Sequence, residues 1–295
     1  MTQPLQDTGA ITVMAPAKIN LCLHICGRRD DGYHLLDSLV VFAGVGDRIS
    51  VASDADISLA ITGPFGAALA GESDNLVLRA ARLLKSKHAV AAGARITLEK
   101  NLPVASGIGG GSADAAATLV ACGRLWGVDP TQLDDREVAA SLGADVPVCL
   151  RAIPAFMSGI GEIIDAAPAL PEAWLVLVNP GEPLSTKAVF TALRGRFSAP
   201  MTRAGLAGLA DAKALTDVMQ HAHNDLMAPA RELLPSVNTV LEALAQTPGC
   251  LLARLSGSGP TCFGVFSDAT LAQNAAAALA AAQPRWWTAA APMLK

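Results

Sequence analysis

The stretch Pro103-Val104-Ala105-Ser106-Gly107-Ile108-Gly109-Gly110-Gly111-Ser112-Ala113 decides the fold that this sequence predicts. It follows an alternating segment at residues 94–99, typical of a strand, and precedes an alanine-rich run at residues 114–126, typical of a helix. Its four glycines allow sharp turns and leave no side chain between the backbone N–H groups and an anion. Because the helix also points the positive end of its dipole at the loop, this order of elements favours phosphate binding.

Other glycine-rich loops fit the stretch less well. A Walker loop requires Gly-Lys-Ser or Gly-Lys-Thr, which does not follow here. Gly107 and Gly109 match the first two glycines of a dinucleotide fingerprint, but Ser112 stands where the third should be. Ser112 can cap the helix and can offer its hydroxyl to a phosphate or a metal. A glycine turn without any ligand is the structural alternative.

Composition excludes several classes of function. The chain has 295 residues, enough for two domains, with a net charge of −4 and only 4% aromatic residues. We therefore expect no nucleic-acid partner, because there is neither a basic field nor a set of aromatic stacking platforms. The polar segment at residues 1–9 lacks the layout of a signal peptide, and no apolar run reaches the ~18 residues that span a membrane. The sequence leaves the oligomeric state open.

Cysteine usage points to a reducing compartment. The six cysteines are scattered through the chain without the spacing of a disulfide framework or a zinc site. We expect them to be small core residues of a cytoplasmic protein.

Two charged residues lie among apolar neighbours. Lys18 lies within the strand predicted at residues 11–26, where its alternating part begins after Pro16, and its apolar neighbours favour a buried, directed ammonium. Asp145 lies between Ala144 and Val146, and carboxylates are seldom placed so without a partner or a task. Lys18 is the partner that we propose for Asp145, and an aspartate that caps a turn is the alternative.

Two further pairs of residues have both a structural and a functional interpretation. Tyr33, the only tyrosine, sits beside His34 in a polar loop that is either an ordinary turn or a contact for a planar ligand. Asp74 and Asn75 precede a helical pattern and are typical caps. A second loop of small residues at 256–261 suggests that two walls enclose one anion site.

The remaining periodicity predicts alternating strands and helices. The predicted strands are residues 11–26, 35–42, 47–52, 94–99, 155–164, 174–178, 251–255, 262–266 and 285–290. The predicted helices are residues 76–84, 114–126, 133–142, 184–193, 224–245 with a break near Pro235, and 269–282. A turn is expected at residues 44–47, and residues 199–211 are left without an assignment.

Four motifs together resemble the GHMP kinases, the group of galactokinase, homoserine kinase and mevalonate kinase. They are residues 16–21, 103–113, 143–147 and 255–261. The resemblance implies an α+β fold of two domains with the active site in the cleft between them. These would be an N-terminal ribosomal-protein-S5-domain-2-like α/β domain at residues 1–165 and a C-terminal α/β sandwich domain at residues 166–295. It also implies ATP as phosphoryl donor, with Mg²⁺ delivered on ATP, and leaves the protein ligands of the metal unknown.

Within this group, residues 27–34, 75–76, 161–162 and 224–225 are similar to members of the non-mevalonate isoprenoid pathway. The acceptor of those members is a tertiary hydroxyl of a small molecule, a cytidine diphosphate-linked methylerythritol. The resemblance implies a general base at Asp145 paired with Lys18, and a loop at residues 103–113 around the ATP phosphates. The other implied contacts are Asn75 and Leu76 to adenine, Tyr33, His34 and Phe190 to cytosine, and Asn20 to the acceptor.

Three competing interpretations remain at this point. The first is another GHMP small-molecule kinase, such as homoserine or mevalonate kinase, whose acceptor has no base for Tyr33 and His34 to contact. The second is a non-catalytic nucleotide-binding domain, which has no need of Lys18 and Asp145. The third is a dinucleotide-dependent oxidoreductase, which Ser112 disfavours.

Overall fold

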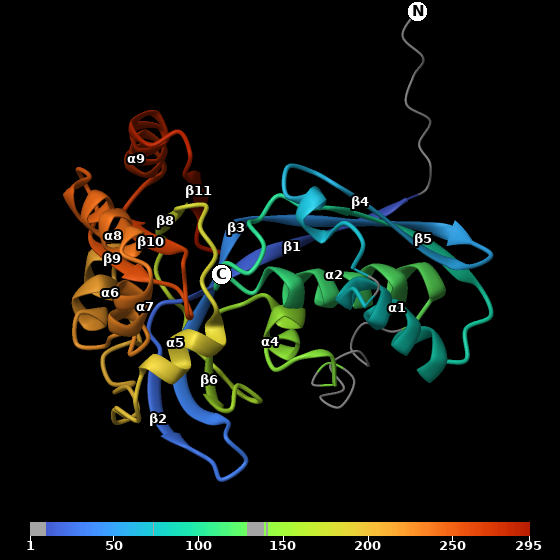
Figure 1. Ribbon diagram of the computed structural model, residues 1–295, viewed down its shortest axis with the longest axis horizontal. Helices are drawn as coiled ribbons and strands as arrows, with labels where there is room; N and C mark the ends of the chain where they lie inside the picture. The colour runs from blue at the N-terminus through green and yellow to red at the C-terminus, as the bar shows by residue number, and fades with distance from the viewer. Residues whose placement is uncertain (1–9, 73, 129–138, 140) are drawn as a thin grey trace, which may run out of the picture. The chain divides into compact units, whose positions relative to one another are not determined.

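The computed structural model describes residues 10–72, 74–128, 139 and 141–295, and most of the helix predicted at residues 133–142 lies outside them (Figure 1). The chain forms two compact units that alternate along the sequence. The first unit is Met1–Ala15, Gly46–Val104 and Gly111–Leu150, and the second is Pro16–Val45, Ala105–Gly110 and Arg151–Lys295. The division into domains at residues 1–165 and 166–295 stays a prediction.

The first unit packs two helices on one side of a sheet (Figure 1). Strand β4 (Ile57–Thr62) pairs in parallel with β5 (Gly93–Glu99), as their shared register shows. Helix α1 (Leu76–Lys87) buries Val77, Ala80, Ala81 and Leu84, the 3.6-residue stripe that the sequence predicts. The other elements of this unit are η1 (Gly66–Leu69), α2 (Gly110–Trp126) and α4 (Val146–Arg151).

A single long strand replaces the two strands predicted at residues 35–42 and 47–52. Strand β3 (His34–Asp54) runs without a turn; its start pairs with β6 (Ala155–Gly159) and its end with β5. The predicted turn at residues 44–47 is wrong. A Cβ atom at Gly44 would lie 2.9 Å from Cγ of Pro292, so this glycine allows a close approach rather than a turn.

The strand predicted at residues 11–26 is divided in two. Strand β1 (Ile11–Asn20) ends before β2 (His24–Arg28) begins. Between them, the carbonyl of Leu21 accepts a 2.7 Å hydrogen bond from the buried Arg254, and the N–H of Leu23 donates to the carbonyl of His223 at 2.8 Å. These distant partners take the backbone groups that a continuous strand would use, and alternation in the sequence does not reveal them.

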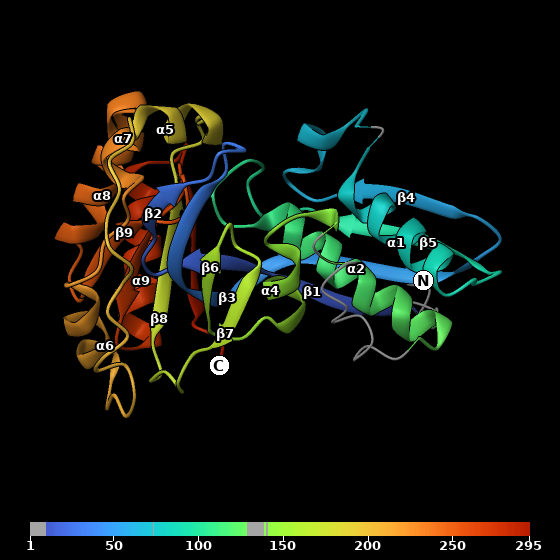
Figure 2. The same cartoon turned by 90° about the horizontal axis from the view of Figure 1, so that it is seen from below.

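The second unit contains an antiparallel sheet in the order β11-β8-β10-β9. Its strands are β8 (Trp174–Asn179), β9 (Leu252–Leu255), β10 (Cys262–Phe266) and β11 (Trp287–Pro292). Its helices are α5 (Thr186–Ala192), α6 (Ala212–Met219), α7 (Met227–Leu233), α8 (Ser236–Gln246) and α9 (Ala269–Ala282). Figure 2 shows helices α7 and α8 beside this sheet. Their apolar side chains join a core with Val176, Val178 and Phe266.

Several predictions for this unit are confirmed. The chain breaks at Pro235 between α7 and α8, and α9 has the predicted bounds. The single strand predicted at residues 155–164 is wrong: β6 (Ala155–Gly159) and β7 (Ile163–Ala166) form a hairpin, because the backbone turns at Gly159 and Gly161, which have positive φ. The unassigned segment at 199–211 begins against β2, where the carbonyl of Ala199 accepts a 2.8 Å hydrogen bond from Nδ1 of His24. Helix α6 follows it and was not predicted.

Candidate active site

Residues 105–110 of the glycine loop are held by the second unit. The carbonyl of Ser106 accepts from the N–H of Thr261 at 3.2 Å, and that of Ile108 accepts from the N–H of Lys18 at 2.9 Å. The hydroxyl of Ser256 donates to the carbonyl of Gly107 at 3.1 Å. The two small-residue loops therefore contact each other, as the prediction of two walls requires.

Glycine is required where these two loops cross. Gly107 has φ of 76°, and a Cβ atom there would lie 2.6 Å from the carbonyl oxygen of Gly259. Gly257 has φ of 55°, and its Cβ atom would lie 2.7 Å from the carbonyl oxygen of Gly107. Asn224 supports the second loop by donating from Nδ2 to the carbonyls of Leu255 and Gly257, both at 2.9 Å. The backbones thus meet at distances that no side chain permits.

Strand β1 places Lys18 and Asn20 beside the loop. Lys18 is only 5% exposed, which confirms the prediction of a buried ammonium, and its Cβ atom would lie 3.1 Å from a Cβ at Gly109. Asn20 is also buried, and its side-chain amide donates to the hydroxyl of Ser38 at 2.8 Å. Its backbone N–H donates to the hydroxyl of Ser256 at 3.3 Å, so Asn20 has a fixed orientation next to both loops.

Helix α2 begins earlier than the helix predicted at residues 114–126. The helix begins at Gly110, so Ser112 lies in its first turn instead of capping it. A Cβ atom at Gly111 would lie 3.5 Å from Cδ1 of Leu76, so Leu76 is next to this first turn. Asn75 caps α1 as predicted, with its side-chain oxygen accepting from the N–H of Val77 at 2.9 Å.

Asp145 lies at the start of α4 in the first unit. Its carbonyl accepts from the N–H of Cys149 at 3.1 Å, and its side chain is partly exposed. Two residues earlier, a Cβ atom at Gly143 would lie 4.0 Å from the hydroxyl oxygen of Ser112. The turn that carries Asp145 is therefore adjacent to the first turn of α2. The pairing of Asp145 with Lys18, which belongs to the other unit, stays a prediction.

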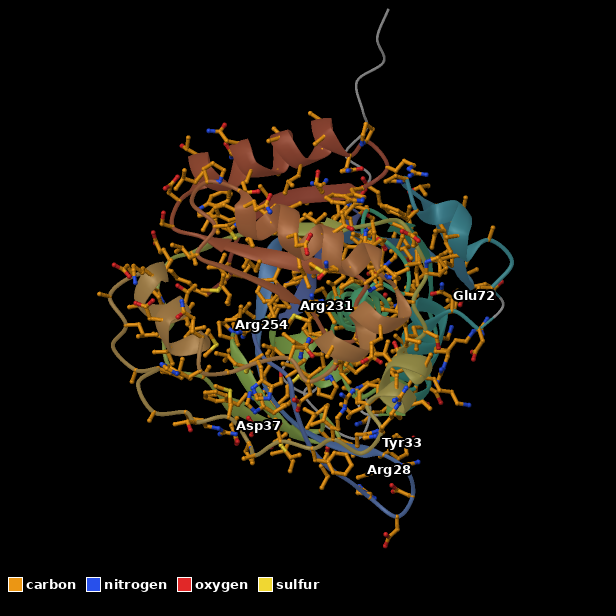
Figure 3. The ribbon with its side chains drawn as sticks, turned by 60° about the vertical axis from the view of Figure 1, so that its left-hand side comes forward. Arg28, Tyr33, Asp37, Glu72, Arg231 and Arg254 are labelled. Atoms are coloured by element: carbon orange, nitrogen blue, oxygen red, sulfur yellow. The ribbon has the colours of Figure 1, made fainter. Side chains whose placement is uncertain are left out.

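His34 and Phe190 meet in a pocket of about 530 Å³ within the second unit. Their ring centroids are 4.8 Å apart at 38°, and Phe197 meets His34 edge-on at 6.4 Å. Burial, together with the charge of Arg28, lowers the pKa of His34 below its ordinary value, which favours a neutral ring. Tyr33 does not line this pocket and is 61% exposed (Figure 3 labels it with Arg28, on the β2–β3 hairpin).

Sequence reasoning missed the cations of this pocket. Arg28, Lys187 and Arg194 line it together with the aromatic rings. A signal was present in the sequence, because Lys187, Phe190, Thr191 and Arg194 follow one another at the spacing of a single helix face. An aromatic pocket rimmed by cations suits a planar ring that is joined to a negatively charged group.

A second missed feature is a buried cluster of charges next to the glycine loop. The ammonium of Lys100 donates to Oδ2 of Asp47 at 2.5 Å and to Oδ2 of Asp114 at 2.7 Å, and all three residues are almost fully buried. Burial raises the pKa of Asp114 to about 7, against the opposing effect of Lys100. Burial alone would lower the pKa of Lys100, but Asp114 and Asp47 outweigh it and raise the pKa.

Three further expectations concern metal, cysteine and membrane. Within the described residues, no three His, Cys, Asp or Glu side chains form a group able to hold a metal ion. All six cysteines are free; four are buried, whereas Cys26 and Cys250 are partly exposed. None of the helices in the described ranges has the length and apolar character needed to cross a membrane.

Family models match both halves of the chain. The GHMP kinases N terminal domain matches residues 75–152, and the GHMP kinases C terminal domain matches residues 206–285. The chain therefore belongs to the GHMP kinase family, and it has the α+β fold of that family. It is an ATP-dependent small-molecule kinase.

Relatives that are similar in sequence over nearly the whole chain belong to one group within the GHMP kinases. A 4-diphosphocytidyl-2-C-methyl-D-erythritol kinase of Paramagnetospirillum magneticum is 53% identical over 97% of this chain and 99% of its own. One of Cereibacter sphaeroides is 55% identical over 95% of this chain and 98% of its own. A crystal structure of 4-(cytidine 5'-diphospho)-2C-methyl-D-erythritol kinase, 34% identical, superposes with a TM-score of 0.80 over 97% of this chain and 100% of that one. Homoserine kinase from Cytophaga hutchinsonii, 19% identical with a TM-score of 0.74, covers 100% of this chain and 96% of its own and shares the fold.

The crossing of the two loops predicts a specific cost for a side chain at Gly107. Gly107→Ala should lower the free energy of unfolding by about 2 kcal/mol or more, because backbone atoms obstruct the new Cβ. Gly208→Ala is the matched control: Gly208 has a similar φ of 72°, but nothing lies within 4 Å of its Cβ position. Urea denaturation measures both, and equal losses for the two variants would disprove the close crossing.

Proposed function

We propose that this chain transfers the γ-phosphoryl group of ATP to the C2 hydroxyl of 4-diphosphocytidyl-2-C-methyl-D-erythritol. The products are the 2-phosphate and ADP, in the non-mevalonate (methylerythritol phosphate) route to isoprenoid precursors. The observation that carries the proposal is the pocket in which His34 and Phe190 are rimmed by Arg28, Lys187 and Arg194. An acceptor with a base and a diphosphate uses such a pocket, whereas homoserine, mevalonate and galactose have no base to place in it.

The donor side of the proposal rests on the glycine loop. Residues 103–113 would hold the ATP phosphates through backbone N–H groups, with the first turn of α2 adding its dipole. Asn75 and Leu76 would lie near the adenine, which is supported by the position of Leu76 next to Gly111. ATP supplies the electrophilic phosphorus, and Mg²⁺ would arrive with it, bound mainly through phosphate oxygens and water.

The proposed chemistry requires one base and one cation. The carboxylate of Asp145 would accept the proton of the tertiary hydroxyl as its oxygen bonds to phosphorus. The ammonium of Lys18 would keep Asp145 ionised and offset the charge on the transferring group. Support comes from each residue separately: Lys18 is buried against Gly109, and the turn before Asp145 lies beside Ser112.

The acceptor side assigns the base and the alcohol to different residues. His34 and Phe190 would hold the cytosine by stacking and by hydrogen bonds to its edge, with Tyr33 contacting it from the hairpin. Asn20 would contact the methylerythritol unit, because its buried amide is held by Ser38 and it lies two residues after Lys18 on β1. The two matched family domains support the proposed division at residues 1–165 and 166–295.

A panel of acceptors tests the proposed reaction. ATP consumption should be rapid with 4-diphosphocytidyl-2-C-methyl-D-erythritol and at least about a hundredfold slower with homoserine, mevalonate or galactose, because only the first fills the aromatic pocket. Preference for an acceptor without a base would overturn the substrate assignment while leaving the kinase class intact.

Replacing the proposed base should abolish turnover without abolishing nucleotide binding. Asp145→Asn should lower kcat by at least about a hundredfold, the scale of a lost general base, with ATP affinity close to that of the wild type. Asp217→Asn, in an exposed i,i+4 ion pair with Lys213, is the control and should keep full activity. Near-normal turnover of Asp145→Asn would remove Asp145 from this role.

Removing the imidazole should weaken binding of the acceptor alone. His34→Ala should raise KM for the acceptor by about tenfold or more, because one ring contact and one hydrogen bond are lost. KM for ATP should change less than about twofold, the expectation for a side chain that does not contact the nucleotide donor. The exposed His221→Ala serves as control. An effect of His34→Ala on KM for ATP alone would contradict the cytosine assignment.

A further inference from the structure

The charge cluster Lys100, Asp47 and Asp114 brings three separate segments to one buried point. Asp47 lies on β3, Lys100 directly follows β5, and Asp114 is in α2. Lys100 and Asp114 enclose the glycine loop in the sequence, one on each side of residues 103–113. The Lys100 side chain, whose ammonium joins both carboxylates, is 3% exposed, so water has little access to these bonds.

Asp47 also holds the backbone that enters the loop. Its Oδ1 accepts from the N–H of Asn101 at 2.6 Å and from that of Leu102 at 2.8 Å. The same carboxylate, through Oδ2, accepts from Lys100. One fully buried side chain thus fixes three consecutive residues immediately before Pro103.

Asp114 holds the helix that leaves the loop. It lies two residues after Ser112, and its carboxylate is bonded to Lys100. Its carbonyl also accepts from the hydroxyl of Thr118 at 2.7 Å, but this bond lies within α2 and does not join the helix to β5. A link between Lys100 and Asp114 therefore sets the position of the first turn of α2 relative to the end of β5. The end of β5 and the first turn of α2 are the two segments that flank the loop in the sequence.

The ammonium of Lys100 donates its hydrogen bonds to these two carboxylates. Lys100 therefore differs from a lysine whose ammonium contacts a phosphate. A buried ion pair is weak support for stability, because apolar residues of similar volume often stabilise as well. Its directional bonds do fix geometry, and the four glycines of the loop have no side chains that could do so.

We propose that Lys100, Asp47 and Asp114 are positioning residues that fix both flanks of the glycine loop so that its N–H groups converge on the ATP phosphates. This inference rests on the proposed role of residues 103–113 as the phosphate-binding loop. The cluster acts through the backbone, and it affects the donor nucleotide without affecting the acceptor.

Substitutions at Asp114 separate positioning from packing. Asp114→Ala removes the bond to Lys100 and should raise both Kd and KM for ATP by at least about tenfold, because a displaced loop no longer places its N–H groups at the phosphates. KM for the acceptor should stay within about twofold. Asp114→Asn keeps an oxygen for Lys100 and should restore ATP binding to within about threefold of the wild type. Thr118→Val, which removes a hydroxyl bonded to the Asp114 carbonyl, is a control expected to leave ATP binding unchanged.

A combined variant keeps the test decisive if Asp114→Ala does not fold. Lys100→Met with Asp114→Leu replaces the ion pair by apolar groups of similar volume, which buried sites often tolerate. Asp47→Asn in the same variant avoids leaving a buried carboxylate without its ammonium, and it keeps an oxygen for the N–H groups of Asn101 and Leu102. We expect this variant to fold, by circular dichroism, and to bind ATP at least about tenfold more weakly in calorimetric titration. Wild-type affinity in a folded combined variant would overturn the positioning role.

The same titration distinguishes failure of this inference from failure of the proposed function. If the wild type binds ATP and the variants bind it equally well, only the positioning role is wrong. If the wild type binds ATP but does not phosphorylate the cytidyl acceptor, only the substrate assignment is wrong. A wild type that does not bind ATP would overturn both.

Discussion

At its glycine positions, the proposed phosphate-binding loop has no side chains with which to hold the shape of its backbone. Because glycine has no Cβ atom, an anion can approach its backbone closely. For the same reason glycine lacks the side-chain contacts that normally fix a backbone. The surrounding structure must supply that order, and in this chain the backbone carbonyls of residues 106–108 are bonded to Thr261, Ser256 and Lys18. Most other features of the candidate site depend on this constraint.

The need to order the glycine loop from outside applies both to the charge cluster and to the proposed catalytic lysine. Lys18 bonds to the loop through its backbone N–H, so the strand that carries the proposed catalytic ammonium also supports the loop. On the flanks, Asp47 and Asp114 share the ammonium of Lys100. The interactions that order the loop therefore lie in buried neighbours, where they would not compete with a bound phosphate.

The sequence predicted what local pattern determines. The strand, glycine loop and helix at residues 94–126, the cap at Asn75 and the break at Pro235 all arise from periodicity or from backbone chemistry at a few adjacent residues. The sequence did not predict the uninterrupted strand β3, because Gly44 allows the close approach of Pro292, almost 250 residues away in sequence. The charge cluster of Lys100, Asp47 and Asp114 was not predicted for the same reason. In the sequence each residue is typical of a surface charge, and only tertiary packing brings the three together in a buried position.

The central claim is that one glycine loop, fixed from outside, presents ATP to an alcohol activated by Asp145 and Lys18. A crystal structure with a non-hydrolysable ATP analogue and 4-diphosphocytidyl-2-C-methyl-D-erythritol tests it most directly. The account predicts phosphate oxygens within hydrogen-bond distance of N–H groups in residues 107–112, with the Asp145 carboxylate and the Lys18 ammonium both at the C2 hydroxyl. Phosphates bound away from this loop, or a C2 hydroxyl out of reach of Asp145, would contradict it.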